Sequence, residues 1–426
     1  MGCGWDEGST KSVLTVLAFF ALFYPPVGGL GRAFGHDGQK WLILAGFGML
    51  AGGRLDVRWL PWLGWSLFSA VFAYDWWQGF FGEWGVYNSA VVQCLLLWAV
   101  YGARWPGGHR MYGWALRCAV GLSGYLALSQ FFTGVVPGSS VVAGFAGRAY
   151  GGMGSPVYLG ALLAVVGPVV LPGAGWLFSA FFITVMLSTG ARGAFVALAV
   201  GAGYLVLMRW PRWKAVAVCS AFGSAVLAVV LMASPADRVA SDSGRMLIWR
   251  TCARAGVSAG PWGWGPENTM YAVEAFKDRG AWMGVYGKGP IHGHWLMTEG
   301  HAHNAVLESF VATGAGVLPF LFLAWCVWTS AMPGRPRAVL LALAAASMFN
   351  PVPLTVKAVA LMYAGMRSSP SRFVFEAPRI SFAIAALSFF AALYCARLSL
   401  VAFDEAMPLA VREQAAVAVR MLHLTN

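Results

Sequence analysis

His303 and Asn304 stand side by side at the boundary between a polar, glycine-rich segment and the long apolar stretch 305–330. In a chain this hydrophobic, an imidazole at such a boundary is expected where the bilayer meets water. An imidazole titrates at about pH 6.5, so His303 could act as a general base near neutral pH. Asn304 could orient that imidazole.

Three arginines are expected on the same face of the membrane as this pair. Arg148 precedes an apolar span, Arg192 lies in a sharp turn between two spans, and Arg245 opens an amphipathic helix. An arginine near hydrocarbon is costly without a partner, and a guanidinium binds phosphate through a planar fork of donors. The arginines therefore predict an anion site. Alternatively, Arg148 and Arg192 could reach lipid headgroups. Arg245 could instead pair with Asp242 or Glu299.

Four histidines lie within twelve residues and could bind Zn²⁺ or Cu²⁺: His292, His294, His301 and His303. They include no helical i, i+4 pair, and no carboxylate accompanies them at a typical spacing. No metal is assigned to them, and no cofactor is expected. The glycines of Gly263–Gly265 follow no strand, which argues against a nucleotide-binding loop.

The composition indicates which class of protein carries these residues. The chain is 59% hydrophobic and 11% charged, and apolar runs recur along nearly its whole length. A soluble domain could not bury them, so we expect an all-α, polytopic transmembrane helical bundle of about 12–13 spans. The first apolar run lacks a small-residue cleavage site and is expected to begin the first span. The net charge of +12, from 29 basic and 17 acidic residues, is expected to reflect basic cytoplasmic loops rather than nucleic-acid binding.

The predicted spans form two groups around one large polar segment. Residues 1–232 hold the N-terminal spans, 233–302 form a large, partly helical periplasmic loop, 303–402 hold the C-terminal spans, and 403–426 form an amphipathic tail. The spans are expected near 13–30, 38–53, 59–73, 87–103, 113–133, 156–172, 175–189, 192–208, 213–232, 303–330, 337–349, 353–367 and 380–402.

Basic residues predict the orientation. Their clusters follow the even-numbered spans, so the positive-inside rule places the clusters and the N-terminus in the cytoplasm. The clusters are Arg54/Arg58, Arg104/Arg110/Arg117, Arg209/Arg212/Lys214, Arg335/Arg337 and Arg367/Arg372/Arg379. The loop 233–302 then faces the periplasm. Within it, apolar spacing predicts helices over 243–257 and 270–276, and glycines and prolines predict irregular backbone over 260–266.

Four segments in a fixed order carry a family resemblance. They are Arg148–Pro156, Ser188–Gly193, Gly244–Trp249 followed by Gly263–Gly265, and His303–Asn304 followed by Gly314. In this order, and all on the predicted outer face, they resemble the O-antigen ligase and O-antigen polymerase superfamily of bacterial envelope glycosyltransferases. The resemblance covers residues 148 to about 320. The chain departs from the family pattern at Ser155, where the family has Asn, and at Val317, where it has Gly.

The resemblance implies transfer of a glycan from undecaprenyl diphosphate to an acceptor hydroxyl, at the periplasmic face of the inner membrane. It implies an inverting reaction without a metal. His303 would be the general base, and Arg192 and Arg245 would stabilise the departing diphosphate. The residues expected to bind substrate are Arg148, Asn304, His301 and Trp264. Trp264 could equally belong to an interfacial aromatic belt.

The acceptor is left open by the sequence. The dominant outer loop favours a ligase that transfers the glycan to lipid A–core. A polymerase would extend another lipid-linked glycan, and an oligosaccharyltransferase would modify a protein hydroxyl. From a different class, a transporter could bind an anionic lipid-linked substrate with the same arginines, although the chain shows no internal repeat. A metal-dependent hydrolase built on the four histidines is a further alternative.

Overall fold

The computed structural model is mostly helical, with 78% helix and 3% strand among the residues it describes. This confirms the prediction of a helical protein. The described residues are 7–23, 40, 42–51, 53–81, 90–103, 105, 108–134, 148–211, 235–278, 280–282, 301–350, 352–368 and 373–387.

The helices follow the predicted apolar spans closely. Their bounds are α1 Glu7–Ala21, Leu42–Ala51, α3 Leu60–Val71, α5 Ala90–Tyr101, α6 Gly108–Thr133, α7 Pro156–Val170, α8 Trp176–Thr189, α9 Arg192–Arg209, α14 Ala305–Thr313, α15 Val317–Ser330, α16 Arg335–Ser347, α17 Leu354–Met366 and Pro378–Leu387. Short elements are η1 Val57–Trp59, α4 Trp76–Phe81, η2 Gly151–Met153 and η3 Gly314–Gly316. The predicted span 213–232 and the predicted tail 403–426 lie outside the described residues.

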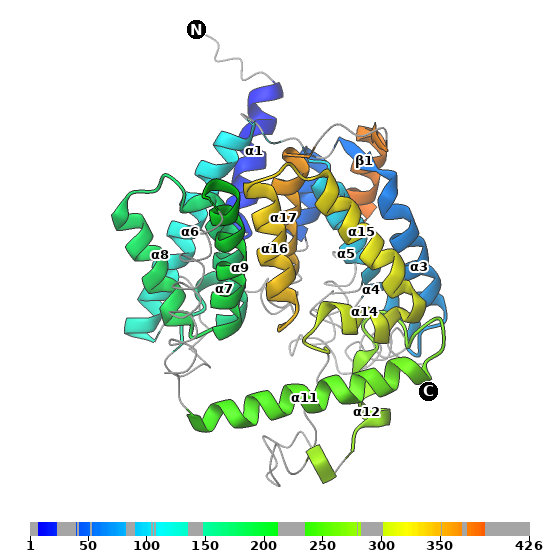
Figure 1. Ribbon diagram of the computed structural model, residues 1–426. Coiled ribbons are helices and arrows are strands. Elements are labelled where there is room, and N and C mark those ends of the chain that lie inside the picture. Colours follow the sequence, from blue (N-terminus) through cyan, green and yellow to red (C-terminus); the bar gives the residue numbers. More distant parts are fainter. Residues whose placement is uncertain are drawn as a thin grey trace, which may run out of the picture.

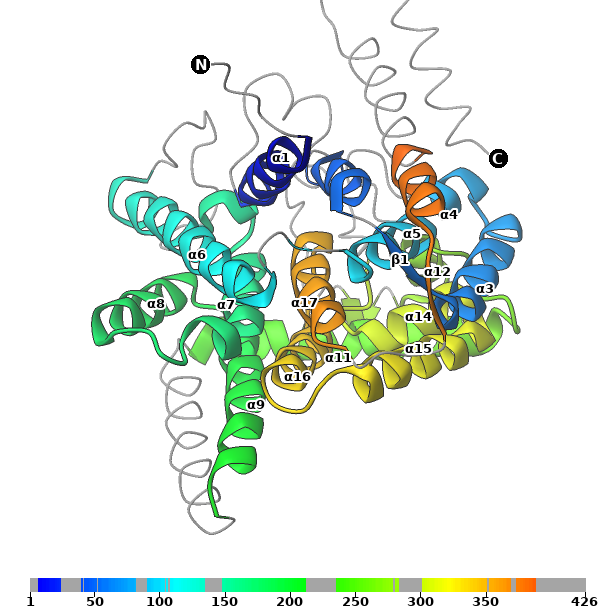
Figure 2. The ribbon, with the colours of Figure 1, turned by 90° about the horizontal axis from the view of Figure 1, so that it is seen from above.

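The polar segment contains one long and one short helix. The long helix α11, Pro235–Ser258, runs across one end of the bundle (Figures 1 and 2). It begins earlier than predicted, so Arg245 lies in its interior rather than at its start. Pro235 at the first helical position fits this earlier start. The short helix α12, Thr269–Phe276, matches the prediction.

A two-stranded antiparallel pair was not predicted. β1, Arg54–Asp56, pairs with β2, Val374–Glu376, in a register that sets Arg54 opposite Glu376. Strands of three residues are too short to produce a recognisable period in the sequence. The pair brings the first and last predicted basic clusters together at the end of the bundle opposite α11 (Figure 1).

Helix α7 is buried along nearly its whole length, and small residues let its neighbours approach. A Cβ added at Gly167 of α7 would lie 2.5 Å from Leu198 Cδ1 of α9. One added at Gly201 of α9 would lie 2.9 Å from the backbone oxygen of Ala338 in α16. Such contacts are typical of helices that pack through small residues.

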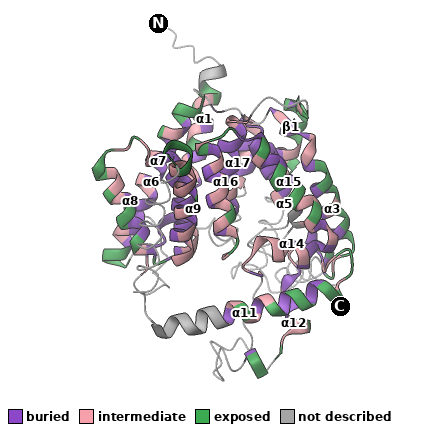
Figure 3. Cartoon of the chain, viewed as in Figure 1, coloured by how far each residue is buried: buried purple, intermediate pink, exposed green. Residues whose placement is uncertain are grey.

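Figure 3 shows exposed residues along the outer faces of the helices, and many of them are large and apolar. More than half of the side chain is exposed at Leu17, Trp114, Tyr125, Trp176, Leu318, Trp325 and Leu387. Among the described helices, two segments are long and apolar enough to cross a membrane, Arg192–Arg209 and Ala305–Ser330. A helix face that exposes several large apolar side chains is typical of a surface that contacts lipid or another protein.

The close packing at Gly201 predicts a strong effect of substitution. Gly201→Leu should lower the midpoint of thermal unfolding in detergent, because the new side chain would overlap the α16 backbone and cost roughly 1–3 kcal/mol or more. Gly121→Leu is the matched control, since nothing lies within 4 Å of a Cβ added at that position in α6. Equal midpoints for the two variants would contradict the packing described.

Candidate functional site

Arg148 lies against the C-terminal end of α8. Its Nε donates to the backbone oxygen of Thr189 at 2.9 Å, and the next residue, Ala149, donates its backbone N–H to the oxygen of Ser188 at 3.0 Å. The side-chain Oε1 of Gln130 in α6 accepts from the backbone of Tyr150 at 2.9 Å. These contacts hold the half-buried Arg148 beside the α8–α9 turn.

The turn between α8 and α9 is tight, and it places Arg192 at the first position of α9. Gly190 takes a left-handed conformation (φ 59°), which glycine adopts without strain. The Thr189 hydroxyl oxygen accepts the backbone N–H of Ala191 at 3.2 Å. A Cβ added at Gly160 of α7 would lie 2.7 Å from Ala191 Cβ, so α7 packs directly against the turn.

Asn350, just beyond α16, joins this turn to α11. Its Oδ1 accepts from Nη2 of Arg245 at 3.3 Å. Its Nδ2 lies 2.9 Å from the position that a Cβ at Gly193 would occupy, next to Arg192 in the first turn of α9. The structure thus places Arg245 and the α9 N-terminus on either side of one amide.

Asn304 contacts the same end of α16 and so places the adjacent His303 near it. As the N-cap of α14, its Oδ1 accepts the backbone N–H groups of Val306 and Leu307 at 3.1 and 3.0 Å. Its Nδ2 donates to the backbone oxygen of Met348 at 3.3 Å. His303 itself has a left-handed backbone (φ 53°), a conformation that is uncommon for residues other than glycine.

Arg148 and Arg192 bring two positive charges near each other. The sequence contains no aspartate or glutamate between Glu83 and Asp237. Within the described part of the chain, neither arginine forms an ion pair. Burial, followed by the charge of Arg192, lowers the pKa of the Arg148 guanidinium. An anion bound here would offset both the desolvation of Arg148 and its repulsion from Arg192.

His301 belongs to a different polar cluster, centred on Glu308 of α14. Its Nδ1 lies 3.9 Å from Oε1 of Glu308. The same carboxylate accepts from the hydroxyl of Thr269 and from the backbone N–H of Ala302, each at 2.5 Å. Burial lowers the pKa of His301, but the nearby carboxylate of Glu308 and the charge of Glu267 raise it to about 9. A cationic His301 therefore lies two residues before His303.

Trp264 packs inside the polar region. Its Nε1 donates to the backbone oxygen of Ala255 in α11 at 3.1 Å, and its ring lies edge-on to Phe276 of α12. The glycines beside it allow close approach to α14, because a Cβ at Gly263 would lie 2.5 Å from the backbone of Ala312. The irregular backbone predicted here is confirmed. The segment packs against the C-terminal end of α14, where the backbone N–H groups of Trp264 and Gly265 donate to the oxygens of Val311 and Ala312.

The possible metal site is only partly described, because His292 and His294 lie outside the described residues. Within the residues that the structure does describe, no group of three or more His, Cys, Asp or Glu side chains could hold a metal ion.

Asn350 and Glu308 contribute to the site without a role predicted from the sequence. Asn350 lies between two apolar helices, directly before Pro351. A polar side chain at such a break is a signal that could have marked it, because polar groups at membrane depth are costly unless they serve a purpose. Glu308 gives a similar signal as the single acidic residue in the apolar segment 305–330.

Neither the family models nor the curated proteins contain a match to this chain.

The His301–Glu308 pair predicts a pH-dependent stability. A histidine whose pKa is raised by folding stabilises the native state fully below its unfolded pKa of about 6.5. The contribution is lost as the pH rises through about 9. The free energy of unfolding in detergent should therefore fall between these two values, by at most about 3 kcal/mol. His301→Gln, which cannot titrate, should show a smaller fall. Identical profiles for the two proteins would contradict the assignment.

Proposed function

We propose that the protein is an inner-membrane glycosyltransferase that moves a glycan from undecaprenyl diphosphate to an acceptor hydroxyl. One observation carries the proposal: segments far apart in the sequence bring Arg148, Arg192, Arg245 and the His303–Asn304 pair to one end of an apolar helical bundle. Arg148 donates to the oxygen of Thr189 at the end of α8. Arg245, the first turn of α9 and Asn304 all meet at Met348 and Asn350, directly after α16.

The placement in the membrane is part of the proposal. The exposed apolar side chains support a polytopic bundle in contact with lipid. The basic clusters at Arg54 and Arg379 lie near the β1–β2 pair, at the end opposite α11. That arrangement supports a cytoplasmic N-terminus and a site that faces the periplasm.

The proposed chemistry uses a base and fixed positive charge. An acceptor hydroxyl oxygen attacks the anomeric carbon of the glycan while His303 takes the hydroxyl proton. The bond between the anomeric carbon and the phosphate oxygen breaks, and its electron pair leaves with the polyprenyl diphosphate. Arg192 and Arg245 stabilise the negative charge that grows on that leaving group. Direct displacement inverts the configuration at the anomeric carbon.

Asn304 and Asn350 prepare the site before substrate arrives. Asn304 caps α14 and contacts Met348, which keeps the neighbouring His303 next to the end of α16. Asn350 holds Arg245 toward the N-terminus of α9. Groups that are already oriented need little rearrangement as charge develops, and this is the main source of electrostatic catalysis. Lipid A–core is the proposed acceptor, as in a ligase.

Replacing the base or either arginine should stop transfer without affecting insertion. His303→Ala, Arg192→Ala and Arg245→Ala should each reduce transfer by at least about 100-fold. Membranes from a host without its own ligase would be supplied with a labelled polyprenyl-diphosphate glycan, and label on lipid A–core would be measured. Arg250→Ala is the matched control, because Arg250 is an exposed arginine on the same helix as Arg245.

The destination of the label tests the reaction class as well. Long lipid-linked chains would identify a polymerase, and labelled protein would identify an oligosaccharyltransferase. Label that never leaves its carrier, with any acceptor, would favour a transporter. Full activity of His303→Ala would remove the base from the mechanism.

A further inference from the structure

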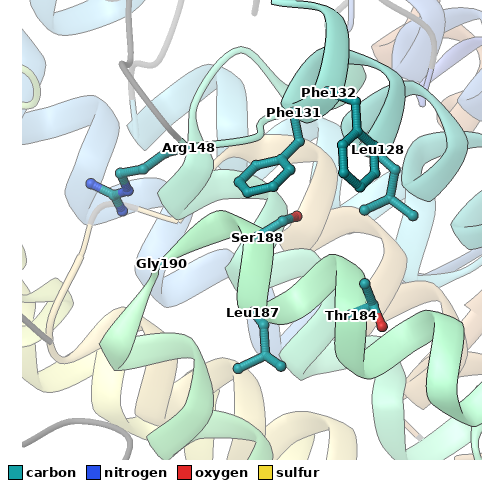
Figure 4. Close-up of a pocket in the computed structure, with 8 residues that line it drawn as sticks. All are labelled: Leu128, Phe131, Phe132, Arg148, Thr184, Leu187, Ser188 and Gly190. Carbon is teal, nitrogen blue, oxygen red and sulfur yellow. The ribbon is translucent and has the colours of Figure 1, made fainter. Parts of the chain in front are cut away.

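A pocket of about 400 Å³ lies between the C-terminal ends of α6 and α8 (Figure 4). Its lining residues are Leu128, Phe131, Phe132, Arg148, Thr184, Leu187, Ser188 and Gly190. Two helices supply almost all of its wall, and Arg148 supplies its positive charge. The proposed chemistry of His303 and Arg245 makes no use of this pocket.

The pocket is built by two facing helical stripes. Leu128, Phe131 and Phe132 are spaced i, i+3, i+4 on α6, and the lining residues of α8 have the same spacing. The helices touch closely one turn earlier, where a Cβ added at Gly124 would lie 2.5 Å from the ring of Phe181. The pocket therefore begins where this tight contact ends.

Apolar side chains at the pocket are exposed at the outer surface of the bundle. Phe132 is 78% exposed and Leu187 is 52% exposed, and the rings of Phe131 and Phe132 meet edge to face with centroids 5.4 Å apart. In the proposed bilayer these groups face lipid, so a hydrocarbon chain can lie against them without meeting water. The wall therefore suits an apolar chain that enters from the side of the bundle.

The positive charge of Arg148 indicates that the apolar molecule also carries a negative charge. Arg148 stands at one end, with its guanidinium turned away from the two phenylalanine rings (Figure 4). Its Nε is held by the oxygen of Thr189, and the sequence around it is free of acidic residues from Glu83 to Asp237. An occupant that matches both ends has a hydrocarbon chain and an anionic head.

We propose that this pocket, the α6–α8 groove, holds the phosphate-proximal part of a polyprenyl diphosphate chain, with the diphosphate bound by Arg148. The inference rests on the proposed function and deepens it, because it assigns the donor an entry route between α6 and α8. Arg192 begins α9 two residues after Gly190, which lines the groove, so a second cation can act on a diphosphate bound there. The remainder of the long chain would lie in the bilayer.

Equilibrium binding to the purified full chain in phosphatidylcholine nanodiscs tests the groove. The ligands are a long-chain polyprenyl diphosphate and inorganic diphosphate. Leu187→Trp would fill the groove and should weaken binding of the polyprenyl diphosphate at least about tenfold, or 1.4 kcal/mol, with binding of inorganic diphosphate unchanged. Arg148→Gln should weaken binding of both ligands.

Ile183→Trp is the matched control, because Ile183 is an exposed apolar residue of α8 outside the groove. Equal affinities of Leu187→Trp and Ile183→Trp for the polyprenyl diphosphate would overturn the proposal. So would competition by phosphatidylglycerol at the same concentration, since the groove would then be a general lipid surface.

Transfer measured on the same variants separates this proposal from the proposed function. If the wild type transfers glycan, and Leu187→Trp binds and transfers equally well, the groove proposal is contradicted and the proposed function stands. If Leu187→Trp weakens binding but the wild type never transfers glycan, the groove proposal stands and the proposed function is contradicted.

Discussion

The contact between the guanidinium of Arg245 and the side-chain oxygen of Asn350 is the interaction on which the candidate site depends. It connects α11, which is polar and lies across the end of the bundle, to the segment directly after α16, with 3.3 Å between Arg245 Nη2 and Asn350 Oδ1. The same amide abuts Gly193 in the first turn of α9. The neighbouring Met348 accepts from Asn304. One short, polar end of a helix is thereby shared by three segments that are distant in the sequence.

This arrangement imposes a cost that a ligand can relieve. Positive groups are gathered at the end of an apolar bundle, and the pKa of Arg148 is lowered by burial and by Arg192. Charge confined to a poorly hydrated site is unstable without a counter-charge, yet it acts strongly on any anion that enters. The tight glycine contacts of α7, α9 and α16 keep the groups in place. The carboxylate of Glu308 instead accepts hydrogen bonds from the hydroxyl of Thr269 and the backbone N–H of Ala302.

The sequence predicted most of the helices because apolar runs report which segments are buried or in contact with lipid. It also predicted that Arg148, Arg192 and Arg245 lie on one face, and the structure places Arg148 beside the turn that leads into Arg192. The positions of Asn350 and Glu308 carry a signal in the sequence, but their partners do not, because a contact between distant segments leaves no periodic pattern in a single chain. The β1–β2 pair was missed because strands of three residues are too short to show a period. The start of α11 was placed too late because its first turns lack a clear apolar stripe.

A double-mutant cycle on Arg245 and Asn350 tests the central claim most directly. The free energy of unfolding in detergent would be measured for wild type, Arg245→Ala, Asn350→Ala and the double variant. A hydrogen bond to a charged group contributes roughly 1.5–3 kcal/mol, so a coupling energy of at least about 1 kcal/mol is expected. Effects that add within about 0.5 kcal/mol would mean that the two residues act independently. The shared anchor at the end of α16 would then be absent.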